Sequence, residues 1–530
     1  MSSIIRQKVG KYIYLYESVS YRNEEGKPRN KRITIGKIDP QTGLPIYKAE
    51  YLERMANAGT PIEIPQNQLS FSVDDIKNSI VKELGSFYLF ENIANKIGLR
   101  DVLGEIFPKT WQFIFNLACY LVATGDPAMY CEDWIAKTDS FSVGPMSSQQ
   151  ISQLLFSITA EERQTFYEKW GAYRSEQEYL ALDITSISSY SELIDDVEPG
   201  YNRDGENLSQ VNLCMLFGEK TGLPVFQTIY SGSLKDVSTL KTTLAQAPNI
   251  YQGNNVMLVM DKGFCSTKNI NAMLSDPSEI KFIIAMPFTH SFAKRQVDSE
   301  RKDIDRLENT IVIGNDVIRG ITKKRSWNTD YEVYTHTYYN AIKATKLKNE
   351  LYGHVSELVR EAEKNPNNPK YTSDFKKYLN IRKSRKRDSG FSISVKDDVV
   401  ESKLATSGWL VLVSNYISDS REGIAIYRMK DVVEKAFMRM KNCLDLGRLR
   451  VQHNDSMQNK VFVGFIALII MAYIHKVMLS EDLYKSMTMK KMIKTLEKLR
   501  VQTINGTRII YPLTKEQKVI FKAFGLAGPS

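Results

Sequence analysis

The order of strands and helices in residues 178–287 constrains the fold of this chain most strongly. Three apolar runs, near 178–188, 211–217 and 223–232, are joined by turns and are expected to be strands. Two further strands are expected at 255–261 and 281–287, with a helical run before each. Strands joined by tight turns usually pair antiparallel, whereas strands joined through helices pair parallel. The sequence therefore predicts an α/β fold with a mixed sheet flanked by helices.

Residues 421–447 are the second constraint, because they contain no Pro, and no Gly between Gly423 and Gly447. They are expected to form one amphipathic helix. Its apolar stripe consists of Ile426, Val433, Phe437, Met440 and Leu444. At about 100° per residue, four further side chains fall within roughly 60° beside the stripe. These four are Tyr427, Lys430, Glu434 and Lys441. A charged flank is common on single helices, and a site for a divalent metal and phosphates is the alternative.

Three acids lie where a site acting on phosphodiesters could form. Asp183 lies in the first strand, Asp261 ends the fourth, and Glu434 lies on the later helix. Each of them alone is more often a turn or cap residue. Together they supply hard oxygen ligands for Mg²⁺, which needs few protein ligands when DNA phosphates complete its shell. Three rival acids rank lower because they fall in polar loop sequence, namely Asp195, Asp196 and Asp204.

The sequence around these acids resembles that of DDE transposases of insertion-sequence family four. The helix resembles the family signature Tyr-x2-Arg-x3-Glu-x6-Lys, with Lys430 in place of Arg. Lysine keeps the positive charge of that Arg but lacks its bidentate fork. The strand motifs agree as well: DITS (183–186), GYNRDG (200–205) with Gln210, and DKGFCS (261–266), in which Lys262 again replaces Arg.

This resemblance implies an RNase H-like fold with a large inserted domain before the catalytic Glu helix. It implies that Asp183, Asp261 and Glu434 are catalytic and bind two Mg²⁺ ions, for which Mn²⁺ can substitute. The implied partners are double-stranded DNA, as transposon ends and as target, and a second copy of the chain in a synaptic homodimer. The implied reaction is cut-and-paste transposition, with binding of terminal inverted repeats, DNA cleavage and strand transfer.

Side chains that contact DNA are expected in three places. The helix and the DKGFCS motif supply the first two, and the inserted domain supplies the third. Related enzymes with a strand-rich insertion hold a flipped base on a Trp there, and Trp327 is the Trp within residues 290–405. Packing in the insertion's own core is the commoner role for such a residue, and a solvated loop is the alternative for the basic run 382–387. The expected DNA-binding residues are Tyr427, Lys430, Lys441, Lys262, Trp327, Arg382, Lys383, Arg385, Lys386 and Arg387.

Composition shifts along the chain indicate six segments. They are a β-rich N-terminal lobe (1–70), a helical lobe for DNA-end binding or dimerisation (71–175), a first part of the catalytic core (176–289), a basic inserted domain (290–405), a second part of the core with the Glu helix (406–480) and a C-terminal helical tail (481–530).

The net charge of +10 favours a polyanionic partner such as nucleic acid. The five cysteines are scattered, which indicates free thiols in a reducing compartment and no zinc site. The N-terminus lacks the apolar core of a signal peptide, and the apolar run 461–474 is shorter than a membrane span, so it is expected to be a buried helix. A bacterial cytoplasmic protein is therefore expected, associated with the nucleoid when bound to DNA.

Two other functions remain open from the sequence. One is an RNase H-like DNA nuclease without strand transfer, and the other is a DNA-binding relative whose catalytic site is unused. The large insertion argues against the first, because simple nucleases of this fold tend to be compact. The intact set of Asp183, Asp261 and Glu434 argues against the second.

Overall fold

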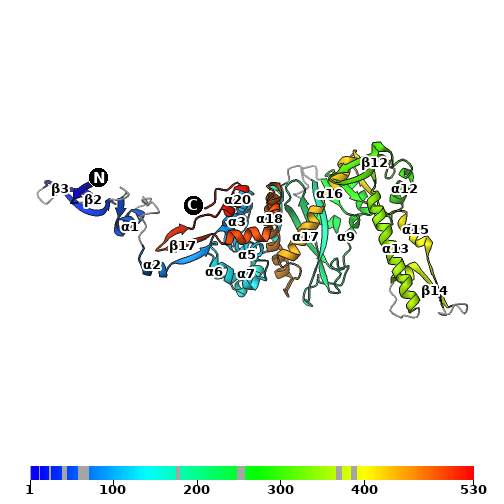
Figure 1. Ribbon diagram of the computed structural model, residues 1–530, viewed down its shortest axis with the longest axis horizontal. Coiled ribbons are helices and arrows are strands. Elements are labelled where there is room, and N and C mark those ends of the chain that lie inside the picture. Colours follow the sequence, from blue (N-terminus) through cyan, green and yellow to red (C-terminus); the bar gives the residue numbers. More distant parts are fainter. Residues whose placement is uncertain are drawn as a thin grey trace. The chain divides into compact units, whose positions relative to one another are not determined.

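The computed structural model describes most of the chain and divides it into two compact units (Figure 1). The first unit consists of residues 1–80 and 502–509, and the second of residues 81–501 and 510–530. The described residues are 2–10, 12–22, 26–38, 45–57, 71–174, 179–246, 257–365, 373–383 and 391–529.

The first unit is built on a four-stranded antiparallel sheet. Its strands follow one another in chain order: β1 (Ser2–Val9), β2 (Tyr12–Arg22), β3 (Pro28–Ile38) and β4 (Pro45–Tyr47). A small core of Leu15, Ile35, Ile38 and Tyr51 joins the sheet to α1 (Ala49–Asn57). Ser72 and Asp75 form a capping box at the start of α2 (Val73–Lys77).

The second unit begins with helices grouped around one long apolar helix, α18 (Asn454–Ser480). The surrounding helices are α3 (Gly85–Lys96), α4 (Leu99–Ile106), α5 (Trp111–Thr124), α6 (Cys131–Lys137), α7 (Ser148–Ser157) and α8 (Ala160–Arg174). Among the described residues α18 alone is long and apolar enough to cross a membrane, but most of it is buried inside the protein. The prediction of a buried helix at 461–474 is therefore confirmed.

A nine-stranded mixed sheet forms the centre of the second unit, in the order β11-β12-β13-β16-β10-β9-β6-β7-β8. β6 pairs antiparallel with β7, and β7 pairs antiparallel with β8. β6 and β10 both pair parallel with β9. These five strands are β6 (Tyr179–Ser188), β7 (Gln210–Gly218), β8 (Pro224–Ser231), β9 (Met257–Met260) and β10 (Lys281–Ala285). Their order and directions confirm the predicted RNase H-like arrangement.

Residues 290–405, expected as one inserted domain, divide into two parts. The first part extends the central sheet through β11 (Thr310–Ile313), β12 (Asp316–Ser326) and β13 (Glu332–Tyr339). β13 pairs antiparallel with β16 (Trp409–Ser414), from Tyr334 opposite Ser414 to Tyr339 opposite Trp409.

The second part has a hydrophobic core of its own, which includes Leu351, Val355, Leu358 and Tyr378. Its helices and strands lie together on the side of β12 and α12 (Ser291–Glu300) in Figure 1. They are α13 (Ala341–Lys364), α14 (Ser373–Tyr378), β14 (Leu379–Lys383), β15 (Phe391–Val395) and α15 (Asp397–Leu404).

Residues 421–447 form two helices, so the prediction of a single helix is wrong. α16 (Ser420–Met429) ends and α17 (Asp431–Cys443) begins at Lys430. The backbone tightens there, because Lys430 N–H donates to Tyr427 O (3.3 Å) and Val433 N–H donates to Lys430 O (2.9 Å), both three residues away. The predicted apolar stripe is confirmed, since all five of its residues are buried.

The chain ends in a helical and stranded segment. Thr514 and Gln517 form a capping box at the start of α20. The elements are α19 (Met489–Glu497), β17 (Arg500–Ile504), β18 (Thr507–Ile510) and α20 (Lys515–Ala523).

Candidate active site

Asp183 and Asp261 lie next to each other in the register of two parallel strands. The last paired residues of β6 and β9 are Leu182 and Met260, and each is followed by one of these acids. Asp261 follows β9 and occupies the N-cap position of the short helix η3 (Lys262–Phe264) without a capping hydrogen bond from its side chain, whereas β6 continues through Asp183. The two strands thus bring both predicted acids to one point on the sheet.

The carboxyl group of Asp183 is in an environment that disfavours its negative charge. Burial raises its pKa to about 6, and the nearby negative charge of Asp261 adds to this shift. The backbone N–H of Ile184 (2.9 Å) and the positive charges of Lys430 and Arg203 oppose it. The ionised form of Asp183 is therefore disfavoured, because the nearby positive charges and the Ile184 N–H only partly offset its burial and the charge of Asp261.

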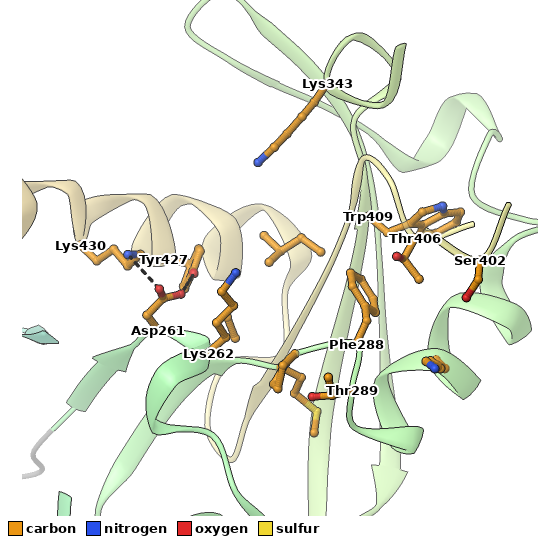
Figure 2. Close-up of a pocket in the computed structure, with 15 residues that line it drawn as sticks. Asp261, Lys262, Phe288, Thr289, Lys343, Ser402, Thr406, Trp409, Tyr427 and Lys430 are labelled. Atoms are coloured by element: carbon orange, nitrogen blue, oxygen red, sulfur yellow. Dashed lines mark hydrogen bonds and ion pairs between the residues drawn. The ribbon is translucent and has the colours of Figure 1, made fainter. Parts of the chain in front are cut away.

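Tyr427 and Lys430 reach Asp261 from the end of α16 (Figure 2). The Tyr427 hydroxyl donates to Asp261 Oδ1 at 2.9 Å, and Lys430 Nζ lies 3.8 Å from Asp261 Oδ2. Burial raises the pKa of Tyr427, and the adjacent Asp261 carboxylate raises it further. Tyr427 therefore stays a neutral donor that fixes the orientation of one Asp261 oxygen.

Glu434 reaches the strand acids only through Lys430. Its Oε1 accepts a hydrogen bond from Lys430 Nζ at 2.6 Å, and its side chain is 53% exposed, against 11% for Lys430. Burial lowers the pKa of Lys430, but Glu434, Asp261 and Asp183 together raise it above its usual value. One ammonium group thus lies among all three predicted carboxylates. Within the described residues no group of three acidic, His or Cys side chains is arranged to hold a metal ion.

Lys441, the last residue of the helix signature, is paired with one of the rival acids. Its Nζ lies 2.6 Å from Asp204 Oδ2, and its side chain is 12% exposed. The other rivals, Asp195 and Asp196, lie in the loop that follows β6. Burial raises the pKa of Asp196, and the charges of Asp195 and Glu198 add to the shift.

The two loop motifs are joined by a residue that the sequence analysis did not single out, Asp236. An Arg203 nitrogen contacts both of its carboxylate oxygens at 2.7 Å. A Cβ at position 263 would lie 2.6 Å from Asp236 Oδ2, so any larger residue there would have to displace this carboxylate. Asp236 thereby connects the GYNRDG loop to the DKGFCS turn and supports the backbone that carries Asp261.

A second pair anchors the same loop. Arg448 donates to both Glu206 oxygens at 2.5 and 2.6 Å, and Ser188 donates to Glu206 Oε2 at 2.6 Å. The hydrogen bonds from Arg448 and Ser188 lower the pKa of Glu206 to about 2. From the sequence, the contact between Glu206 and Arg448 could have been found only by asking which opposite charges pair across this loop.

A cavity of about 790 Å³ opens beside Asp261. Figure 2 shows Lys262 pointing into it near Asp261, Lys343 entering from α13, and Phe288 and Trp409 forming the wall farther from Asp261. Trp327 does not line this cavity. Its Nε1 donates to Asn271 Oδ1 at 2.7 Å, and its ring packs against His290 and Phe292.

The remaining predicted DNA contacts belong to the basic run. Arg382 and Lys383 are exposed at the end of β14, on the part of the insertion that has its own core. Arg385, Lys386 and Arg387 lie outside the described residues.

Comparison with known proteins identifies the family of this chain. Residues 174–470, more than half of the chain, match the family model described as the transposase DDE domain. The chain belongs to the DDE transposase family. The matched span includes β6, β9 and α17, which carry the three predicted acids. No curated protein matches the chain.

Among solved structures, this DDE transposase is similar to the cryo-EM structure of the piggyBac transposase synaptic complex with hairpin DNA. The sequence identity is 10% and the TM-score 0.35, over 82% of this chain and 72% of that chain.

Proposed function

We propose that this DDE transposase belongs to insertion-sequence family four and performs cut-and-paste transposition. It binds terminal inverted repeats of double-stranded DNA as a homodimer, cleaves at the ends and joins the free 3′-hydroxyls to target DNA. The observation that carries the proposal is the cluster of Asp183, Asp261 and Glu434 around the Lys430 ammonium group.

The chemistry of this donor set suits Mg²⁺, because it offers carboxylate oxygens, but in the present conformation the Lys430 ammonium group lies where an ion would bind. Asp183, Asp261 and Glu434 would hold two ions, and Mn²⁺ would substitute. Bound ions supply activation of the attacking water or 3′-hydroxyl and stabilisation of the leaving oxygen. For this, Glu434 must exchange its hydrogen bond to Lys430 for the metal, which leaves Lys430 available for a DNA phosphate. Tyr427 keeps Asp261 oriented during the exchange.

Further contacts with DNA surround the cluster. Lys262 and Lys343 place ammonium groups in the cavity beside Asp261, and Lys441 can exchange Asp204 for a phosphate. Arg382 and Lys383 add positive charge on the inserted part, as would Arg385, Lys386 and Arg387 in the same run. An unpaired base needs an aromatic surface, and in this cavity Trp409 offers one where Trp327 does not.

Strand transfer distinguishes a transposase from a nuclease of the same fold. Incubated with Mg²⁺, precut ends bearing free 3′-hydroxyls and a target plasmid, the protein should yield covalently joined products on a gel. The end sequence can be taken from inverted repeats in the DNA that flanks the gene. Cleavage without joined products, over a range of salt and with Mg²⁺ or Mn²⁺, would favour the nuclease. Binding without either reaction would favour a relative with an unused site.

Replacing the two tryptophans should affect end processing differently. Trp409→Ala is expected to slow end processing by folded protein about 10- to 100-fold, because base stacking contributes roughly 1–3 kcal/mol, and to lower the melting temperature, since its ring packs against Tyr339 and Arg301. Trp327→Ala should lower the melting temperature without slowing end processing by folded protein, since it removes packing against Phe292 and the hydrogen bond to Asn271. Thermal melting and single-turnover cleavage measure the two effects. Unchanged cleavage in Trp409→Ala would remove this residue from the site.

A further inference from the structure

The strands β2 and β3 of the first unit extend well beyond the core that holds them. Their inner halves carry Leu15 and Ile35, which are 2% and 1% exposed. Every described residue of the outer halves, from Val19 to Arg22 and from Gly26 to Ile33, is exposed. β1 pairs with β2 only as far as Val19, so the last pairs, Ser20 with Asn30 to Arg22 with Pro28, form a two-stranded ribbon.

This ribbon belongs to a basic part of the chain. Residues 1–38 contain nine Lys and Arg and three acids, a large share of the chain's net charge of +10. Glu17 is the one acid among the described residues of this stretch, and Arg54 already pairs with it. The described cations are Arg6, Lys8, Arg22, Lys27, Arg29, Lys31, Arg32 and Lys37.

The cations of the ribbon point to both of its faces. Side chains alternate along a strand, so Arg22, opposite Pro28, lies on one face and Arg29, opposite Tyr21, on the other. Arg32 and Lys31 continue these two faces at the base of the ribbon, where Ser18 and Val19 also pair with β1. Arg29 shares the face of Lys31. Adjacent like charges weaken a strand pair and exposed strands bury no apolar surface, so this arrangement does not serve the stability of the unit.

Protection of a sheet edge is the simplest alternative role for these cations. The outer half of β3 is an edge, because β4 pairs only with Gly36 to Ile38. Lysines on an edge prevent pairing with other chains. An edge needs only one or two such charges, however, and protection of an edge does not explain cations on both faces of the ribbon.

We propose that the β2–β3 ribbon, in its described residues 18–22 and 26–32, binds double-stranded DNA by entering the major groove. A groove about 12 Å wide admits a two-stranded β-ribbon, and its two phosphate walls match cations on both faces. Ser20 and Asn30, the first pair beyond the end of β1 and linked by a hydrogen bond of 2.6 Å, present a hydroxyl and an amide that suit base edges. DNA as the partner class rests on the proposed function, and the ribbon is a site separate from the acid cluster.

The salt dependence of DNA binding tests the ribbon in the full chain. The variant Arg29→Gln/Lys31→Gln/Arg32→Gln should bind a fluorescent mixed-sequence duplex at least about tenfold more weakly near physiological salt, and the slope of log K against log[salt] should fall by roughly 2–3. Lys490→Gln/Lys491→Gln/Lys494→Gln, on the exposed side of α19, removes the same charge and should leave both quantities near wild type. Fluorescence anisotropy in a salt series measures them.

Binding of the ribbon in the major groove can be tested separately, by chemical protection of the bases. Wild-type protein bound to the DNA that flanks its gene should protect guanine N7 atoms from dimethyl sulfate, and the ribbon variant should lose that protection. A double-stranded RNA should bind much more weakly, because its major groove is too narrow to admit the ribbon. Equal affinity for RNA would overturn the proposal.

Different results would contradict the proposal of groove binding by the ribbon and the proposal of strand transfer. An unchanged slope and footprint in the ribbon variant, with increased light scattering, would overturn groove binding and leave edge protection as the role of the cations. Wild-type protein that shows the ribbon effects but never joins DNA ends would overturn strand transfer alone. Wild-type protein with no affinity for duplex DNA would overturn both.

Discussion

Asp183→Asn is expected to abolish DNA cleavage while leaving DNA binding largely intact. The substitution keeps the shape of the side chain but removes a negative charge from the point where β6 and β9 meet. If the carboxylates hold metal ions, the rate should fall by on the order of a thousandfold or more, which is the scale of single catalytic groups. Binding should persist, because affinity comes mainly from phosphate contacts elsewhere. Asp261→Asn and Glu434→Gln should behave alike. Single-turnover cleavage and anisotropy measure the two properties.

Stability provides the control for Asp183→Asn. Burial raises the folded-state pKa of Asp183 to about 6, above the ordinary value of 3.8. The folded protein therefore binds a proton more tightly than the unfolded chain, so stability contributed by this group is lost as pH rises towards 6. Without metal, Asp183→Asn should melt at a temperature equal to or above wild type at pH 8, and close to wild type at pH 4. A variant that is inactive and also less stable at pH 8 would indicate a structural role instead.

Local sequence was sufficient for the five neighbouring strands β6 to β10, at one end of the sheet. β6 to β10 are apolar runs separated by turns or helices, and the type of connection determines whether neighbours pair parallel or antiparallel. The same reasoning brought Asp183 and Asp261 together, because two parallel neighbours align their ends. The buried stripe of α16 and α17 followed from helical spacing, which does not depend on distant contacts.

Features that depend on distant pairing were not predictable in this way. The pairing of β13 with β16 joins residues far apart in sequence, and it places Trp409 beside the cavity. The contacts of Trp327 with His290 and Phe292 also join residues that are distant in the sequence. The break at Lys430 has no Gly or Pro to mark it. Its ammonium lies between Asp261 and Glu434, so the position of that turn is tied to charges on another element.

Lys430 is where metal binding and DNA binding should be coupled. Its ammonium group is within 3.8 Å of Asp261 and 2.6 Å of Glu434, and the charge of Asp183 also acts on it. A divalent ion that takes these carboxylates must displace the ammonium or bind against its repulsion. A DNA phosphate that attracts Lys430 would remove that obstacle. Metal and DNA should therefore bind cooperatively, because each favours the arrangement that the other needs.

Lys430→Met should consequently change metal affinity and activity in opposite directions. Without DNA, the variant is expected to bind Mn²⁺ about tenfold more tightly or better, a gain of roughly 1.4 kcal/mol, because the competing charge is gone. With DNA and saturating metal, cleavage should fall about 100-fold, since a cation that acts on the phosphate is lost. Lys430→Arg should keep activity, and Lys435→Met, exposed on the same helix, should leave both properties unchanged. Titration calorimetry with Mn²⁺ and single-turnover cleavage separate these effects. Weaker or unaltered Mn²⁺ binding in Lys430→Met would mean that the lysine helps to assemble the three carboxylates and does not compete with the metal for them.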